Sequence, residues 1–75
     1  MNKKLLRSVM ILHDDTNAAL AKYLGITEQS LSNKINENGT EFKQSEIARI
    51  KERYNLDCDM VDRIFFAEEV SNLDT

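Results

Sequence analysis

The sequence predicts an all-helical single domain, and three observations carry this prediction. The chain has 75 residues, below the usual domain size of about 100 to 150, so it can build only one small hydrophobic core. It contains two glycines and no proline, which leaves few residues to turn a chain between strands. Apolar residues recur at intervals of three and four, which is typical of amphipathic helices.

Two helices are expected in the first third of the chain. The first covers residues 2–12, where one helical face carries Leu5, Leu6, Val9 and Met10. The second covers residues 17–24, which are rich in alanine and leucine. Thr16 can cap its N-terminus by accepting a backbone hydrogen bond. Gly25 can end it, because glycine adopts the left-handed conformation of helix C-termini without a steric penalty.

Three more helices follow. Thr27 can cap a polar helix over residues 28–36, which has only Leu31 and Ile35 as large apolar side chains. The Asn-Gly pair at 38–39 interrupts the chain, and the isolated aromatic Phe42 is expected to anchor this loop to the core. A fourth helix is expected over residues 44–54. Asp57 can cap a last helix, whose apolar positions are Met60, Val61, Ile64 and Phe65.

Charge divides the chain into two parts. The net charge is −3, which argues against a generally cationic protein that coats nucleic acid or membranes. Residues 1–56, however, carry nine basic and seven acidic side chains, whereas residues 57–75 carry one basic and six acidic. We therefore expect a domain over residues 1–66 that can present a modest basic surface, followed by an acidic C-terminal tail over residues 67–75.

The residues that usually carry catalysis or bind metals are scarce. One cysteine and one histidine form no zinc-binding pattern and no catalytic set, so we expect no metal, no cofactor and no enzymatic activity. His13 is expected at the surface, and Cys58, which has no cationic neighbour in the sequence, is expected to be an inert thiol. No apolar run approaches the length of a membrane span or forms a signal peptide, which predicts a cytoplasmic protein without membrane contact.

Residues 17–36 form the most informative segment, because two short helices are expected there with a three-residue turn between them. Ala21 lies four residues before Gly25, where a small side chain lets two helices cross closely. This segment resembles the helix-turn-helix of the lambda repressor and Cro family, also called XRE-type, and the flanking helices match as well. The resemblance covers roughly residues 2–66. It implies a compact five-helix lambda-repressor-like DNA-binding domain with the helix-turn-helix at its second and third helices.

The resemblance implies that the helix beginning after Thr27 enters the major groove of DNA. The residues expected to contact bases are Thr27, Glu28, Gln29, Ser32 and Asn33. Asparagine and glutamine can pair with adenine through two hydrogen bonds, glutamate can accept from cytosine, and serine or threonine can contact either base. The alternative is that these residues are merely solvated. Residues 27–36 contain no arginine, the commonest side chain in base contacts, so the affinity is expected to be modest.

Backbone phosphates are expected to be bound by the flanking residues. The resemblance assigns this role to the start of the second helix and to the start of the fourth, where helix N-termini offer free N–H groups. Lysines nearby would add positive charge, although each of them is about equally compatible with a solvated surface position. The expected phosphate contacts are Asn17, Lys22, Lys34, Lys43, Gln44 and Ser45.

The family binds DNA as dimers, which predicts a homodimer here too. Phe66, Val70 and Leu73 form an apolar stripe out of phase with the core stripe that ends at Phe65. We expect this stripe to form the contact between subunits. The alternative, that these residues fold back on their own core or fray, is about as well supported by the pattern.

Together these features predict a small transcriptional regulator of bacterial or phage type, acting as a repressor, with double-stranded DNA as its partner and no small-molecule substrate. The alternative from another class is a protein–protein interaction module that keeps the helical scaffold but does not bind DNA. The acidic balance of the chain is consistent with this alternative. Salt dependence separates the two, because DNA binding weakens steeply as the salt concentration rises.

Overall fold

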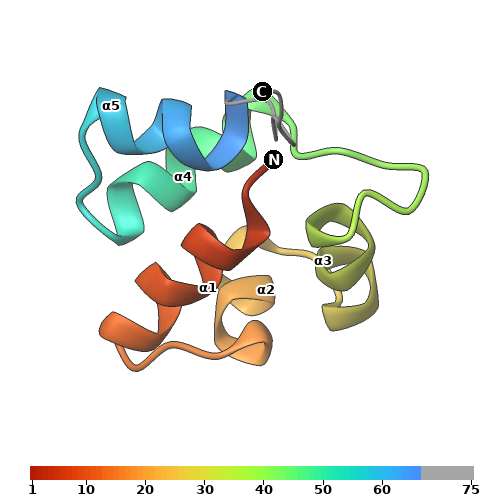
Figure 1. Cartoon of the computed structure of the whole chain (residues 1–75). Coiled ribbons are helices and arrows are strands. Elements are labelled where there is room, and N and C mark those ends of the chain that lie inside the picture. The colour runs from red at the N-terminus through yellow and green to blue at the C-terminus, as the bar shows by residue number, and fades with distance from the viewer. Residues whose placement is uncertain (67–75) are drawn as a thin grey trace.

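Helices make up the regular structure of residues 1–66, the part of the chain described by this computed structural model (Figure 1). They are α1 (Lys3–Leu12), α2 (Asn17–Leu24), α3 (Glu28–Ile35), α4 (Gln44–Arg53) and α5 (Cys58–Val61). The last of these continues into a π-helical turn, η1 (Asp62–Phe66). The prediction of a compact all-helical domain is confirmed. The predicted acidic tail, residues 67–75, lies outside the described residues.

Local hydrogen bonds explain where the helices begin and end. The side chains of Thr16, Thr27 and Asp57 each accept a hydrogen bond from the backbone N–H three residues later, over 3.1, 3.0 and 2.8 Å. These are the three predicted N-terminal caps, and each satisfies a donor that the first helical turn leaves without a partner. Gly25 ends α2 in the left-handed conformation, with φ 75° and ψ 29°.

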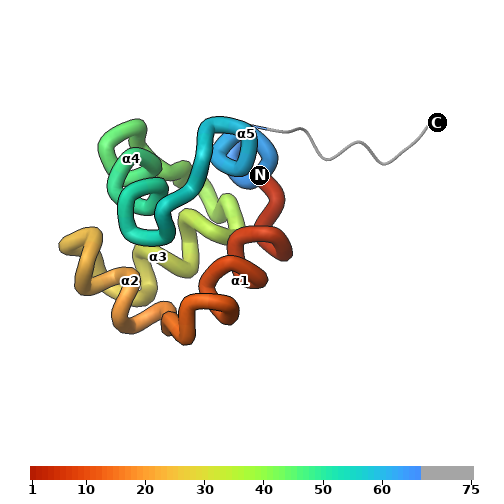
Figure 2. Tube along the Cα trace, turned by 90° about the vertical axis from the view of Figure 1, so that its left-hand side faces the viewer, coloured from red at the N-terminus to blue at the C-terminus, as the bar shows by residue number. Residues whose placement is uncertain are grey.

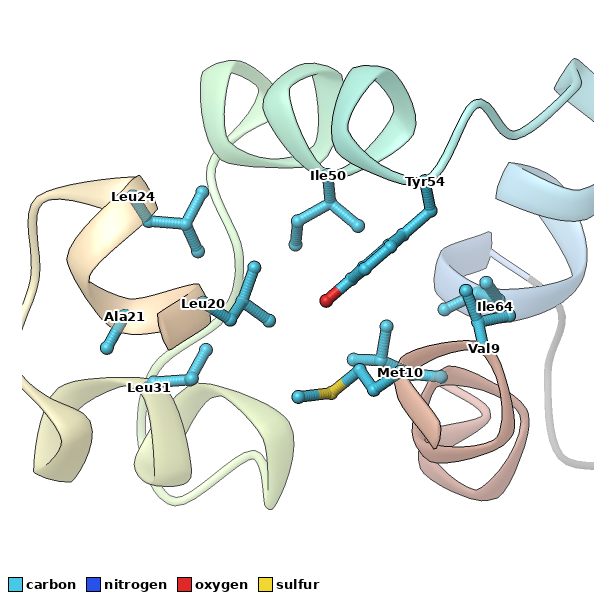
Figure 3. Packing of buried hydrophobic residues seen from close by; sticks show 10 residues of the cluster. Val9, Met10, Leu20, Ala21, Leu24, Leu31, Ile50, Tyr54 and Ile64 are labelled. Carbon is cyan, nitrogen blue, oxygen red and sulfur yellow. The ribbon is translucent and has the colours of Figure 1, made fainter. Parts of the chain in front are cut away.

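The core forms where five elements converge. Each of α1, α2, α3, α4 and η1 contributes one side chain that is at most 1% exposed, and these are Leu6, Leu20, Leu31, Ile50 and Ile64. Figure 3 shows side chains from α1, α2, α3 and η1 arranged around Ile50 and Tyr54 of the α4 end. Leu31 anchors α3 in this apolar core, and Ile35 is partly buried against it. In α3, Glu28 and Gln29 are exposed, so its first turn is free for other contacts.

Contacts between distant segments close the fold. The backbone N–H of Asn2 donates to the carbonyl of Ile64 over 2.7 Å, which ties the start of α1 to η1. Phe42 packs edge-to-face against Phe65 with ring centroids 5.5 Å apart, so the predicted loop anchor is confirmed. Figures 1 and 2 show α4 and α5 on one side of the molecule and α1 with α2 on the other, and Figure 1 shows α3 at the edge remote from α5.

The last predicted helix differs from a regular α-helix. Its α-helical part is four residues long, and the following five residues form the wider π-helical turn η1. Val61 and Ile64 are buried as the apolar pattern predicted, and Met60 and Phe65 are partly buried against the core. Phe66 is 52% exposed.

Candidate nucleic-acid interface

Two eight-residue helices joined by a three-residue turn form the centre of the candidate site. The N–H of Ile26 donates to the carbonyl of Ala21 over 3.0 Å, which closes the C-terminus of α2. Ala21 is 2% exposed, in agreement with its predicted place between crossing helices. The turn directs the chain away from α2 and sets the start of α3 at Thr27, whose side chain then caps that helix.

The residues predicted to contact bases lie along α3 and at its N-terminus. Thr27, Glu28 and Gln29 are exposed, and Ser32 and Asn33 are partly exposed. The side-chain amide of Gln29 donates to the side-chain oxygen of Asn33 over 3.2 Å, so these residues share one face as their spacing of four predicts. Gln29 and Asn33 lie on the side of α3 opposite the buried Leu31, and Ser32 lies beside them, whereas Thr27 and Glu28 are exposed at the N-terminus of the helix.

This face offers a dense set of hydrogen-bonding groups. The two amides provide both donors and acceptors, the hydroxyls provide either, and the Glu28 carboxylate accepts only. Because Gln29 and Asn33 are bonded to each other, the two amides hold each other in place while leaving further donor and acceptor positions open. Such a pair is suited to a partner with a fixed pattern of acceptors and donors, such as the edge of a base pair.

Five of the six residues predicted to contact phosphates are exposed. Asn17 is the first residue of α2, Lys43 is the residue that precedes α4, and Gln44 and Ser45 are the first two of α4. Lys22 is exposed in the last turn of α2. The N-termini of α2 and α4 thus carry exposed polar side chains. The first N–H groups of each helix have no intrahelical partner.

Lys34 is the exception, and the prediction that it contacts phosphates is corrected. It is 6% exposed, and its Nζ lies 3.2 Å from Glu46 Oε1 and donates to the carbonyl of Glu41 over 3.2 Å. The physical reason is its position three residues after Leu31, which turns it toward the same buried side of α3. Its charge is neutralised by Glu46, whose carboxylate also accepts the Lys43 backbone N–H over 2.9 Å.

A partly buried cluster of charged and polar groups, which the sequence alone did not reveal, fixes the start of α2. The Arg53 guanidinium donates to the two carboxylate oxygens of Asp15 over 2.8 and 3.0 Å, and the Tyr54 hydroxyl also donates to Asp15. Asp15 in turn accepts the Thr16 backbone N–H over 3.0 Å. Because Thr16 caps α2, the cluster positions Asn17 through the bonds of Asp15 to α4.

The same contacts shift the ionisation of the cluster. Hydrogen bonding from Arg53 is the largest influence on Asp15 and, against the opposing effect of burial, lowers the pKa of this carboxyl to about 2. Burial, reinforced by the hydrogen bond to Asp15, raises the pKa of Tyr54. Asp15 therefore stays ionised and Tyr54 stays neutral near neutral pH.

Two arginines of α4 pack against α2 as well. Arg49 and Arg53 lie over the ring of Tyr23, with guanidinium carbons 4.6 and 4.7 Å from its centroid. Arg53 thereby joins Asp15 and Tyr23 in one arrangement. These contacts hold α4 against both ends of α2, and they use arginine side chains to which the sequence pattern assigned no role.

His13 and Cys58 are the remaining residues that the sequence analysis singled out. His13 is exposed and its ring lies 5.1 Å from that of Tyr54. Cys58 is exposed. Its Sγ lies 3.6 Å from the Nζ of Lys51, a cation seven residues earlier in the sequence. Within residues 1–66, no three His, Cys, Asp or Glu side chains are grouped so that they could hold a metal ion, and none of the helices there has the length and apolar character needed to cross a membrane.

Phe66, one of the three residues predicted to form the contact between subunits, is exposed. Val70 and Leu73 lie outside the described residues. The prediction of a dimer contact by this stripe stays a prediction.

Comparison with known proteins gives one family. No curated protein and no solved structure matches the chain. A family model described as a protein of unknown function (DUF739) matches residues 4–68, which include the turn between α2 and α3 and nearly all of the helical structure. The chain belongs to the DUF739 family.

Proposed function

We propose that this protein binds double-stranded DNA with base specificity through a helix-turn-helix of lambda repressor and Cro type formed by α2 and α3. The observation that carries the proposal is the pair Gln29 and Asn33, which are hydrogen-bonded to each other on the side of α3 opposite the buried Leu31. Thr27, Glu28 and Ser32 add polar groups beside this pair. A polar face with no large apolar side chain is what a groove lined by base edges requires.

The dimensions of α3 agree with this function. An α-helix with its side chains is about 10 to 12 Å across, which fits the major groove at about 12 Å wide, and α3 has eight residues, a little over two turns, to place in it. In the proposed complex its outer face contacts base edges through Gln29 and Asn33. The N-termini of α2 and α4, with Asn17 and Lys43, bind the phosphates on either side.

The proposed biological role is that of a small transcriptional regulator of bacterial or phage type, acting as a repressor. A single module with few cations binds weakly, so the proposal includes a homodimer on two half-sites about one helical turn apart. Phe66, 52% exposed at the end of η1, supports a subunit contact there. Sedimentation of the wild type and Phe66→Ser tests this part, since the variant is expected to sediment as a monomer at concentrations where the wild type is dimeric.

A second candidate function is a protein–protein interaction module without DNA binding. It is favoured by three large apolar side chains that are more than half exposed, namely Ile11, Leu12 and Phe66. Exposed apolar groups of this size are common at protein contacts. This function predicts no enrichment of any duplex and little dependence of partner affinity on salt.

Selection of bound duplexes from a random pool tests the proposal. A shared sequence motif is expected, and Gln29→Ala and Asn33→Ala should relax its base preference, each by about 1 to 3 kcal/mol of discrimination. Lys43→Ala should instead weaken binding to all duplexes alike. Lys51→Ala, a lysine of α4 outside the candidate interface, is the matched control. Absence of enrichment at low salt would favour the interaction module.

A further inference from the structure

A cleft of about 550 Å³ adjoins the candidate interface and is assigned no role by the proposed function. One wall is formed by α1, with Lys3, Lys4 and Arg7, and the opposite side includes residues at the start of α2 and in the second half of α3. Asn17 and Ser32 line this cleft and are also members of the candidate interface. The cleft is therefore continuous with the face proposed to contact DNA.

The wall formed by α1 is cationic. Lys3, Lys4 and Arg7 are exposed, share one helical face by their spacing, and precede every acidic residue of the chain, the first of which is Asp14. Within residues 1–66 none of the three has a carboxylate within 4 Å, in contrast to Lys34 and Arg53, which are both paired. Lys3 Nζ donates to the side-chain oxygen of Asn36 over 3.2 Å, which holds this ammonium group at the α3 side of the cleft.

Two of these cations lie at a position where their charge is unfavourable for the stability of α1. Lys3 and Lys4 are the first two residues of α1, and its first turn contains no acidic side chain. A helix N-terminus carries a partial positive charge, so cations there are repelled and anions are favoured. A locally unfavourable choice of residues is expected where function requires it. The positions of Lys3 and Lys4 thus point to an anion outside the protein.

We propose that this cleft binds the sugar-phosphate backbone of the same duplex whose bases α3 contacts, with Lys3, Lys4 and Arg7 neutralising its phosphates. This inference rests on the proposed function. Two features select DNA backbone as the occupant. Three cations that have no carboxylate within 4 Å among residues 1–66 match a row of phosphates, while Asp15, which also lines the cleft, is paired with Arg53. Asn17 and Ser32 connect the cleft to the base-contacting face. The cleft thereby supplies cationic contacts that a recognition helix without arginine lacks.

The test compares matched pairs of charge-removing variants on the full chain. Lys3→Gln/Lys4→Gln removes two cations from the cleft, and Lys51→Gln/Arg63→Gln removes two from α4 and η1, so both have the same net charge. Affinity is measured over a range of salt concentrations for the duplex enriched from a random pool and for an unrelated duplex. Thermal unfolding is measured for each variant.

The cleft variant is expected to bind both duplexes more weakly and by the same factor, about fivefold to tenfold for each cation removed, near 0.1 M salt. Its plot of log K against log salt should be shallower by about 0.9 for each phosphate that is no longer neutralised, or about two in total. Arg7→Gln should show a change of about one. The unfolding temperature of Lys3→Gln/Lys4→Gln should be equal to or higher than that of the wild type, because unfavourable charges leave the helix N-terminus.

Different failures have different meanings. If Gln29→Ala relaxes base preference while the cleft variant keeps the salt dependence of Lys51→Gln/Arg63→Gln, the cleft does not bind phosphates and the proposed function stands. A cleft variant that changes base preference would also overturn the inference. If the wild type binds neither duplex at low salt, the proposed function fails and the inference fails with it.

Discussion

Removal of the charge of Asp15 should destabilise the protein in a way that depends on pH. Asp15→Asn keeps the size of the side chain but leaves one acceptor oxygen in place of two, so it can accept from Thr16 or from Tyr54 but not from both, and it abolishes the ion pair with Arg53. The folded protein lowers the pKa of Asp15 from 3.8 to about 2. At about 1.4 kcal/mol for each pKa unit, this corresponds to an upper value of about 2.5 kcal/mol.

Solvent reduces this value. The Asp15 side chain is 6% exposed, but that of Arg53 is 27% exposed, so water screens part of the attraction. We expect Asp15→Asn to lower the free energy of unfolding by about 1 to 2 kcal/mol at pH 7. Because the folded pKa lies below the unfolded one, the stabilisation is complete above about pH 4 and is lost as the pH falls toward 2. The variant and the wild type should therefore converge in acid.

Urea unfolding at pH 7 and at steps down to pH 2 measures this difference. Subtracting the variant from the wild type cancels the other carboxyl groups of the chain. Asp59→Asn is the matched control, since Asp59 forms an ion pair with Arg63 in which the side chains are 73% and 67% exposed, and its loss should cost less than about 0.5 kcal/mol. Equal stability of Asp15→Asn and the wild type at pH 7, or a difference that does not change with pH, would mean that the ion pair with Arg53 does not stabilise the fold.

Three further predictions concern the turn, the corrected lysine and the amide pair. Gly25→Ala should lower the free energy of unfolding in urea by about 1 to 2 kcal/mol through backbone strain alone, because φ is 75° and an added Cβ meets no atom within 4 Å. An unchanged free energy of unfolding would contradict this. Lys34→Ala should lower the free energy of unfolding by about 3 to 5 kcal/mol, because it leaves the buried carboxylate of Glu46 unpaired. Substitution of the exposed Lys22 by alanine should change it by less than about 0.5 kcal/mol, and similar values for both variants would be inconsistent with the burial of Lys34. Gln29→Ala and Asn33→Ala should lower affinity for the selected duplex non-additively in a double-mutant cycle, and strict additivity would show that the amides act separately.

The boundaries of the helices followed from local chemistry. Thr16, Thr27 and Asp57 cap the helices that follow them because each acts on an N–H three residues away. The left-handed conformation of Gly25 is likewise a property of one residue at a helix end. Such features are visible in sequence because all participating atoms lie within one helical turn.

Contacts between distant residues were beyond the same reasoning. Asp15 lies between the helices expected over residues 2–12 and 17–24, and its partners Arg53 and Tyr54 lie 38 and 39 residues later in the sequence. Lys34 looked like a surface cation because lysine is rarely buried, and its pairing with Glu46 depends on how α4 packs against α3. The cationic cleft was equally invisible in the sequence, because it joins residues of α1 to residues of α2 and α3.

The outer face of α3 was predictable as a set of residues but not as a function. The spacing of Gln29 and Asn33 fixed their common face, and the structure places them there. What those amides contact depends on a partner molecule. The pattern on α3 therefore gives a hypothesis that only binding measurements can test.

Backbone amide chemical shifts, recorded while the selected duplex is added, would locate the binding surface residue by residue. We predict that the largest changes fall on residues 27–33, on the first turns of α2 and α4, and on Lys3, Lys4 and Arg7 of α1. Changes confined to Ile11, Leu12 and Phe66, with residues 27–33 unaffected, would rule out α3 as the DNA-binding element and would place the functional surface on the apolar side chains instead.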